Sequence, residues 1–174
     1  LFANWGVPDF EDVMAAVDYA VEQGYSDPDR LGVGGWSYGG ILTNYVITKS
    51  DRFAGAITGA SEVNYIANYG HDHYQYYWEN ELGLPWENKE AWERISPWED
   101  VDKVVTPTLV MGGKEDWNVP IQNSEQLYQA LKRRGIDTQL VVYPDEDHGI
   151  DRPSFRRDRW QRYVDWYDRT VRGQ

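Results

Sequence analysis

The sequence contains no cysteine, which excludes disulfide bonds, zinc sites built from thiolates and cysteine nucleophiles. It also lacks any run of about twenty apolar residues, and no basic segment followed by an apolar one stands at its start. Neither a membrane-spanning helix nor a signal peptide is therefore predicted. We expect a soluble chain, and the compartment stays open between the cytoplasm and a periplasmic or secreted location.

Positive charge is scarce, because 17 lysines and arginines face 29 aspartates and glutamates, for a net charge of −12. Such a surface repels the phosphates of nucleic acids and the head groups of anionic membranes. We predict neither nucleic acid nor a membrane as a partner. The length of 174 residues suits one domain, and we expect residues 1–174 to form a single unit.

Histidine is also rare, with three copies in the chain. His71 and His73 stand two positions apart, so they would not share a helix face, and a metal site needs three or four convergent ligands. The segment His71-Asp72-His73 is therefore interpreted as a polar loop. No metal and no cofactor is predicted.

Glycine is plentiful around one serine, in Gly35-Trp36-Ser37-Tyr38-Gly39-Gly40. A strand-like run, 31–33, precedes this segment, and a run with helical spacing, 41–47, follows it. In that context G-x-S-x-G indicates a nucleophile elbow, in which a strained backbone exposes the serine hydroxyl. We expect a Cβ on either flanking glycine to clash. The alternative is a glycine-rich turn whose serine has no chemical role.

A nucleophilic serine needs a base and an acid that orients it. His148 lies in a turn-rich segment after the strand-like run 140–142, whereas the loop after a predicted strand at 108–113 offers Glu115 and Asp116. Catalytic groups gather at the carboxyl ends of parallel strands. The order serine, acid, histidine is that of α/β-hydrolases.

The remaining pattern predicts an α/β protein with a mostly parallel sheet and helices on both faces. Its expected elements are helices at 9–23, 121–134 and 154–171 and strands at 53–58 and 138–143. In the last helix we expect Phe155, Trp160, Tyr163, Val164 and Tyr167 to point inward. The aromatic segment 65–98 interrupts this alternation.

These motifs resemble the prolyl oligopeptidase family of serine peptidases, which includes dipeptidyl and acylaminoacyl peptidases. The resemblance runs through nearly the whole chain and rests on residues 35–40, 116–120, 124–128 and 145–149. It implies the α/β-hydrolase fold. It also implies Ser37 as nucleophile, Asp116, in preference to Glu115, as the triad acid, and His148 as general base.

The resemblance implies further residues around the triad. The backbone N–H of Tyr38 matches one donor of the oxyanion hole. Asn118 and Val119 match a pair that contacts the substrate, with Asn118 donating to a peptide carbonyl. Rings from 65–98 are expected to line the pocket for the residue before the cleaved bond, and we predict Tyr69 among them.

The family's His-Gly-Gly-type oxyanion loop, its early sheet strands and its β-propeller have no counterpart among these residues. We therefore expect the C-terminal portion of a hydrolase domain that lacks the early strands. Its sheet edge at 31–34 and the apolar stripes of the helices at 9–23 and 38–48 would be bare. Missing chain, or self-association through the exposed edge, would cover them.

The predicted function is a serine peptidase that hydrolyses short peptides through Ser37, Asp116, His148 and an acyl-enzyme. Two alternatives stay open. The first is a carboxylesterase, because the same triad cleaves esters more readily than amides. The second is a catalytically incomplete fragment that serves as a structural or interaction piece.

Overall fold

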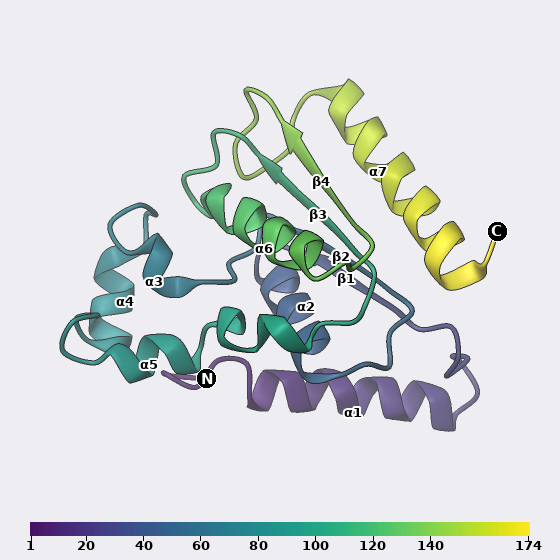
Figure 1. Ribbon diagram of the computed structural model, residues 1–174, viewed down its shortest axis with the longest axis horizontal. Helices are drawn as coiled ribbons and strands as arrows, with labels where there is room; N and C mark the ends of the chain where they lie inside the picture. The colour runs from purple at the N-terminus through teal and green to yellow at the C-terminus, as the bar shows by residue number, and fades with distance from the viewer.

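The computed structural model describes residues 1–174, and its centre is a sheet of four parallel strands in the order β1-β2-β3-β4 (Figure 1). The strands are β1 (Gly32–Trp36), β2 (Gly55–Gly59), β3 (Thr108–Gly113) and β4 (Thr138–Tyr143). Since all strands run the same way, their carboxyl ends meet at one edge of the sheet. The predicted α/β class is confirmed.

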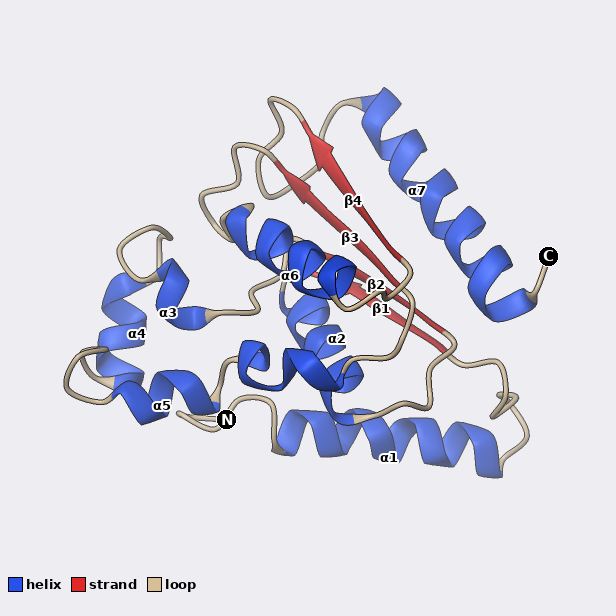
Figure 2. Cartoon of the chain, in the orientation of Figure 1, coloured by secondary structure: helices blue, strands red, loops and turns tan.

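Residues of the inner strands alternate between the two faces of the sheet. Ala56 and Val110 point to the face covered by α2 (Tyr38–Lys49) and α6 (Gln122–Arg133), where they share one buried cluster with side chains of these helices. Ile57, Leu109 and Met111 point to the opposite face, against α7 (Pro153–Tyr167). Helices therefore cover both faces, as expected (Figure 2).

Helix α1 (Pro8–Glu22) lies beside α2 and covers part of the molecule that the sequence predicted to be bare. Its apolar side chains pack against the buried residues Leu31, Val46 and Phe53. Most of α2 is buried as well. The expectation of two bare helix stripes is wrong, because each helix helps to cover the other.

Helix α7 also differs from its predicted inward face. Trp166 is 3% exposed, whereas Trp160 and Val164 are 59% and 52% exposed. Phe155, Tyr163 and Tyr167 pack on the sheet as expected. The apolar stripe of this helix is wider than its contact with the sheet, so its outer positions stay in solvent.

Strand β1 pairs with β2 alone, so one edge of the sheet carries no neighbouring strand. A hollow of about 590 Å³ lies at this edge between β1 and α7, and its lining includes Gly34, Trp36 and Tyr167. Self-association through this edge stays a prediction. Light scattering across a range of protein concentrations would test it.

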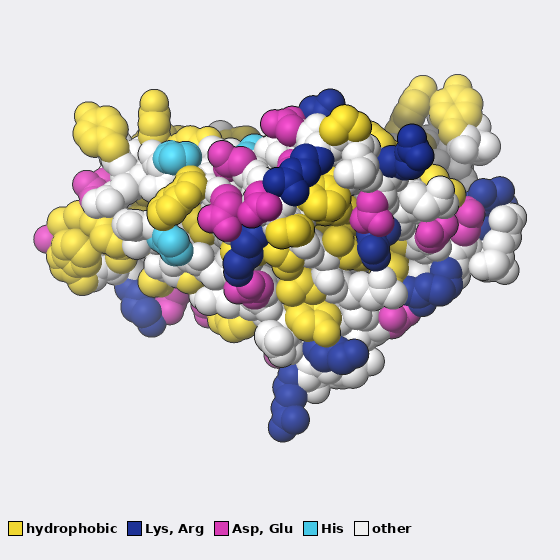
Figure 3. All heavy atoms as spheres, turned by 90° about the horizontal axis from the view of Figure 1, so that it is seen from above, with side chains coloured by type: hydrophobic (Ala, Val, Ile, Leu, Met, Phe, Trp, Pro, Cys, Tyr) yellow, Lys and Arg dark blue, Asp and Glu magenta, His cyan; other side chains and the backbone are white.

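A second layer stands beside the sheet and is built from short helices, α3 (Tyr65–Asn68), α4 (Gln75–Leu82) and α5 (Lys89–Arg94). A 3₁₀ helix, η1 (Pro97–Lys103), connects it to β3. Its core contains Tyr65, Trp78, Leu82, Ala91, Trp92 and Ile95. Hydrophobic side chains are exposed on the surface at the end of the molecule that these short helices form (Figure 3). None of the helices has the length and apolarity needed to cross a bilayer.

Candidate active site

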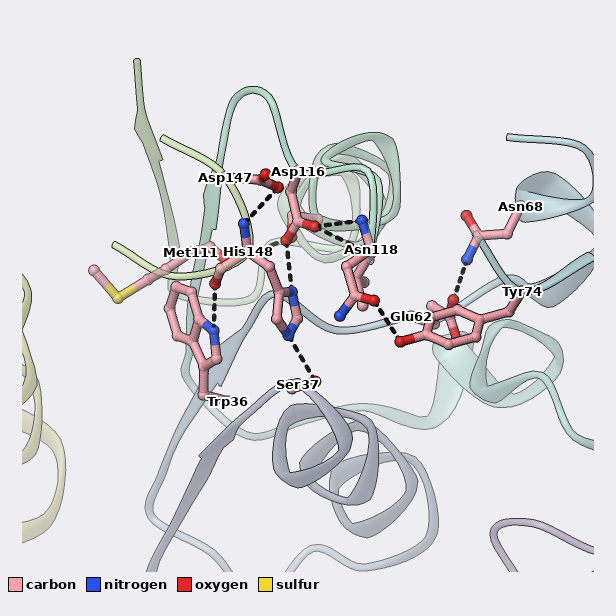
Figure 4. A network of polar contacts seen from close by, with 12 residues as sticks. Trp36, Ser37, Glu62, Asn68, Tyr74, Met111, Asp116, Asn118, Asp147 and His148 are labelled. Atoms are coloured by element: carbon pink, nitrogen blue, oxygen red, sulfur yellow. Dashed lines mark hydrogen bonds and ion pairs between the residues drawn. The ribbon is translucent and has the colours of Figure 1, made fainter. Parts of the chain in front are cut away.

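The loops after the four strands bring four polar side chains to one edge of the sheet. Ser37 follows β1, Glu62 follows β2, Asp116 follows β3 and His148 follows β4. The parallel topology causes this convergence, because the chain leaves every strand at the same edge. Figure 4 shows the resulting network of contacts.

Ser37 occupies the strained turn that its glycines predict. Its φ is 59°, an unfavourable value for a residue with a side chain, and helix α2 begins at the next residue. A Cβ on Gly35 would lie 2.3 Å from the carbonyl carbon of Gly39, and one on Gly40 would lie 2.6 Å from the carbonyl oxygen of Gly59. Gly39 itself has open space, so the expected clash at that flank is wrong. The close approach requires Gly35 and Gly40 instead.

Ser37, His148 and Asp116 form a continuous line of hydrogen bonds. The distance from His148 Nε2 to Ser37 Oγ is 2.8 Å, and that from His148 Nδ1 to Asp116 Oδ2 is 2.9 Å. A carboxylate only accepts hydrogen bonds, so it fixes the tautomer in which Nδ1 carries the proton. Nε2 is then free to accept the proton of the serine hydroxyl.

Asp116 is buried and held by the backbone of its own loop. Its Oδ1 accepts hydrogen bonds from the N–H groups of Asn118, at 2.9 Å, and Val119, at 2.7 Å. These donors leave Oδ2 to His148. Glu115, the neighbouring acid, is exposed and forms no hydrogen bond with His148. The geometry therefore favours Asp116 over Glu115 as the partner of His148.

The loop that carries His148 is fixed on both sides. The indole N–H of Trp36, the residue before Ser37, donates to the carbonyl oxygen of His148 at 2.9 Å. The buried carboxylate of Glu146 accepts hydrogen bonds from the backbone N–H groups of Asp151 and Arg152. The position of the imidazole is thus coupled to the elbow itself.

The backbone N–H of Tyr38 is the first of helix α2, so no earlier helical carbonyl lies one turn before it to accept its hydrogen bond. Such a group, at the positive end of a helix, suits an oxygen that gains negative charge. The phenol of Tyr38 points elsewhere and donates to Asp9 Oδ2 at 2.6 Å. Burial and this carboxylate raise the pKa of Tyr38 above its ordinary value.

A cavity of about 380 Å³ adjoins Ser37 on the side of α4. Most of its wall is aromatic, and its polar groups come from a few residues. The lining consists of Trp5, Ser37, Tyr38, Ile41, Glu62, Tyr74, Tyr77, Trp78, Glu81, Asn118 and Val119. Both residues that were predicted to contact a substrate, Asn118 and Val119, therefore lie on the wall of the cavity that contains Ser37.

The side chain of Asn118 has one open end in this cavity. Its Oδ1 accepts a hydrogen bond from the hydroxyl of Tyr74, whereas its Nδ2 has no acceptor (Figure 4). An amide held by its oxygen presents its N–H donors. The arrangement suits the donation to a carbonyl that the sequence suggests for Asn118.

Tyr69 is not brought to this cavity, contrary to its predicted role. Its ring packs edge-on against Trp86 and Trp92, and its hydroxyl donates to Glu79 at 2.8 Å. Tyr74, Tyr77 and Trp78 line the cavity in its place. They are on or next to α4, and the aromatic content of 65–98 could not distinguish them from rings that pack the layer together.

The side chains of His71 and Asp72 also have structural partners. The ring of His71 lies edge-on to Trp117, and Asp72 accepts hydrogen bonds from the Tyr74 N–H and the Trp78 indole, both at 2.8 Å. Asp72 thereby helps to hold the wall of the cavity.

Glu62 is a cavity residue that sequence reasoning missed. It is 2% exposed, and burial, together with the negative charge of Asp72, raises the pKa of its carboxyl to about 8. Its position directly after a predicted strand, the criterion that selected Asp116 and His148, could have identified it.

Comparison with known proteins identifies a family of peptidases that this chain resembles. Residues 2–174 match the model of the prolyl oligopeptidase family. The peptidase YuxL of Bacillus subtilis is 37% identical over 97% of this chain and 26% of its own length. The acylamino-acid-releasing enzyme of Arabidopsis thaliana is 31% identical over 94% of this chain and 23% of its own length.

Solved structures of peptidases share the fold of this chain. A puromycin-hydrolyzing peptidase of Mycobacterium tuberculosis aligns with a TM-score of 0.90 and 27% identity, over 97% of this chain and 26% of that one. The acylaminoacyl peptidase of Pyrococcus horikoshii aligns with a TM-score of 0.89 and 26% identity, over 95% and 28%. This chain spans about a quarter of the length of the relatives it matches.

Proposed function

The chain belongs to the prolyl oligopeptidase family, and from this membership we propose that it carries the catalytic triad of a serine peptidase that acts on short peptides. Ser37 is the nucleophile, His148 the general base and Asp116 the group that orients His148. The observation that carries the proposal is the line of hydrogen bonds from Ser37 Oγ through both ring nitrogens of His148 to Asp116.

In the first step Ser37 Oγ attacks the carbonyl carbon of the substrate while His148 Nε2 takes the hydroxyl proton. The positive charge that develops on the imidazole is stabilised by Asp116. The carbonyl oxygen becomes negative and approaches the N–H of Tyr38, which donates to it. Such a donor commonly contributes a factor of ~10²–10³ to kcat.

In the second step the tetrahedral intermediate collapses, the C–N bond breaks and His148 gives its proton to the leaving amine. The acyl group stays on Ser37 as an ester. A water molecule then attacks this ester with His148 again as base, and the product acid leaves. Each proton that His148 accepts is returned, so the site is regenerated.

The cavity supports a peptide as the substrate. The open amide N–H of Asn118 can donate to a carbonyl of the peptide, and aromatic rings beside Ser37 can bury a side chain. The names of the relatives, acylamino-acid-releasing enzyme and acylaminoacyl peptidase, favour short blocked peptides among these substrates.

Two chromogenic substrates test the proposal in the intact protein. A peptidase hydrolyses a dipeptidyl or acylaminoacyl p-nitroanilide, and Ser37→Ala abolishes this activity. Hydrolysis of a p-nitrophenyl ester without any hydrolysis of the anilides would support a carboxylesterase instead. No hydrolysis of either substrate would support a structural or interaction role.

A further inference from the structure

The carboxyl group of Glu62 lies on the wall of the cavity that contains Ser37. Oε1 accepts a hydrogen bond from Asn68 Nδ2 at 2.7 Å. The hydroxyl of Tyr65 and the carboxyl of Asp72 also face the carboxyl group of Glu62, and they shift its pKa down and up, respectively. The residue is 2% exposed and still belongs to the lining of the cavity. Its carboxyl group therefore borders the cavity, where a group that enters can contact it.

A network of buried amides fixes the position of Glu62. Asn123 donates to Asn68 Oδ1, which turns the Asn68 amide nitrogen toward Glu62. Asn44 Nδ2 donates to the main-chain carbonyl of Glu62 at 2.9 Å. The carboxyl group is thus held in place before any ligand arrives, which lowers the entropy cost of binding one.

The charge of Glu62 has no partner in the chain. No lysine or arginine lines the cavity, and the second acid on its wall, Glu81, is not in an ion pair either. A buried carboxylate without a cation is unfavourable, and burial together with the neighbouring carboxyl group of Asp72 raises the pKa of Glu62. A cation from outside would remove this cost.

The rest of the wall is also suited to a cation. The rings of Trp5, Tyr74 and Trp78 surround the space beside Glu62, and an ammonium or guanidinium group is attracted to the faces of such rings. The same rings can bury the methylene groups that carry the charge. One cavity thus combines an apolar wall for an aliphatic stem with a carboxylate for its charged end.

We propose that Glu62 determines specificity by binding an organic cation of the substrate in this cavity. The cation is either the side chain of a lysine or arginine at the cleaved bond or the free amino group of the peptide. This inference rests on the proposed function, because a cavity beside Ser37 selects substrates only if Ser37 attacks them.

Phosphonate inhibitors test this proposal without turnover, since they react once with an activated serine. Three diphenyl phosphonates form a matched set: acetyl-lysine, acetyl-norleucine and norleucine with a free amino group. The first differs from the second by a cation on the side chain. The third carries a cation at the amino end in place of the acetyl group. We expect one of the two cationic compounds to modify Ser37 ~10–100-fold faster than acetyl-norleucine, as expected for a hydrogen bond to a charged group.

The variant Glu62→Gln keeps the shape of the side chain and removes its charge. We expect the ratio of cationic to neutral rates to fall to near one, and this ratio cancels any general change in the reactivity of Ser37. Glu90→Gln, on the exposed surface of α5, removes the same charge at a distance and is expected to keep the wild-type ratio.

Equal rates for the three compounds in the wild-type protein would overturn the role of Glu62, even if the variant failed to fold. An unchanged ratio in Glu62→Gln would overturn it as well. Both results leave Ser37 reactive and so leave the proposed function intact. Absence of reaction at Ser37 with all three compounds would overturn the proposed function and this inference with it.

Discussion

Two neighbouring regions differ in how fully their polar groups are paired. One is the line of hydrogen bonds from Asp116 through His148 to Ser37, and the other is the cavity beside Ser37. In the line, both oxygens of Asp116 and both ring nitrogens of His148 have partners within the chain. In the cavity, Asn118 Nδ2 has no acceptor, and the carboxyl group of Glu62 has no cation as a partner. Under the proposed function, the groups that react are thus held by the protein, whereas the groups that recognise a substrate are left for a ligand.

The largest expected effect comes from removing the hydroxyl group of Ser37, which is the reacting group in the line of paired residues. Ser37→Ala is expected to lower kcat by ~10⁶-fold while the chain still folds, because the hydroxyl bonds only to His148. His148→Ala is expected to lose about as much, since the two residues act as one unit. Initial rates on an acylaminoacyl p-nitroanilide measure both, and more than a few per cent of residual activity would exclude Ser37 as the nucleophile.

Asp116→Asn breaks the same region one step further from the substrate. The amide can present its N–H to His148 and stabilise the wrong tautomer, so we expect kcat to fall by ~10⁴-fold. Glu115→Gln is the matched control, because Glu115 is the exposed neighbour, and it is expected to retain near wild-type activity. A similar loss of kcat in both variants would mean that the loop tolerates no substitution, and would contradict a specific role of Asp116 in orienting His148.

Asn118→Ala removes from the cavity the amide whose N–H group has no acceptor in the chain. We expect kcat/KM for a dipeptidyl anilide to fall by an amount that corresponds to ~1–3 kcal/mol of transition-state stabilisation. The kcat/KM for a small acetate ester is expected to change much less, because only the peptide has the second carbonyl. Tyr74→Phe, which releases the oxygen of Asn118, is expected to give a smaller loss with the same substrate dependence. The exposed Asn80→Ala serves as control. Equal losses on both substrates would show that Asn118 supports its loop instead.

The smallest effect concerns stability and its dependence on pH. Because the pKa of Glu62 is raised to about 8, the folded chain binds more protons than the unfolded chain between the ordinary pKa and that value. Wild-type stability from this group therefore falls as pH rises through this window. Glu62→Gln lacks this loss, so its Tm relative to wild type is expected to be higher at pH 9 than at pH 5. Each kcal/mol shifts Tm by about 2–4 °C at this chain length.

Thermal unfolding followed by circular dichroism measures this difference. Glu90→Gln, with the same change in net charge on the exposed surface, is expected to show no such dependence on pH. A Tm difference between Glu62→Gln and wild type that is the same at both pH values would mean that the carboxyl of Glu62 is not destabilised by its burial.

The polar residues at the strand ends were predictable from the sequence, whereas the aromatic residues that line the cavity were not. Ser37, Asp116 and His148 each follow a short apolar strand, and parallel topology alone brings such residues together. The choice among aromatic rings depended on how α3, α4 and α5 pack, which no periodicity in 65–98 reveals. Tyr69 and Tyr74 have the same residue type and lie in the same segment, yet only Tyr74 reaches the cavity.

We infer that His148 and Asp116 activate Ser37, and a fluorophosphonate, which reacts only with an activated serine, measures this activation. After reaction, peptide mass mapping locates the modified residue. We predict one labelled residue, Ser37, and loss of this label in His148→Ala. Label on a different serine, or undiminished labelling of Ser37 in His148→Ala, would contradict it.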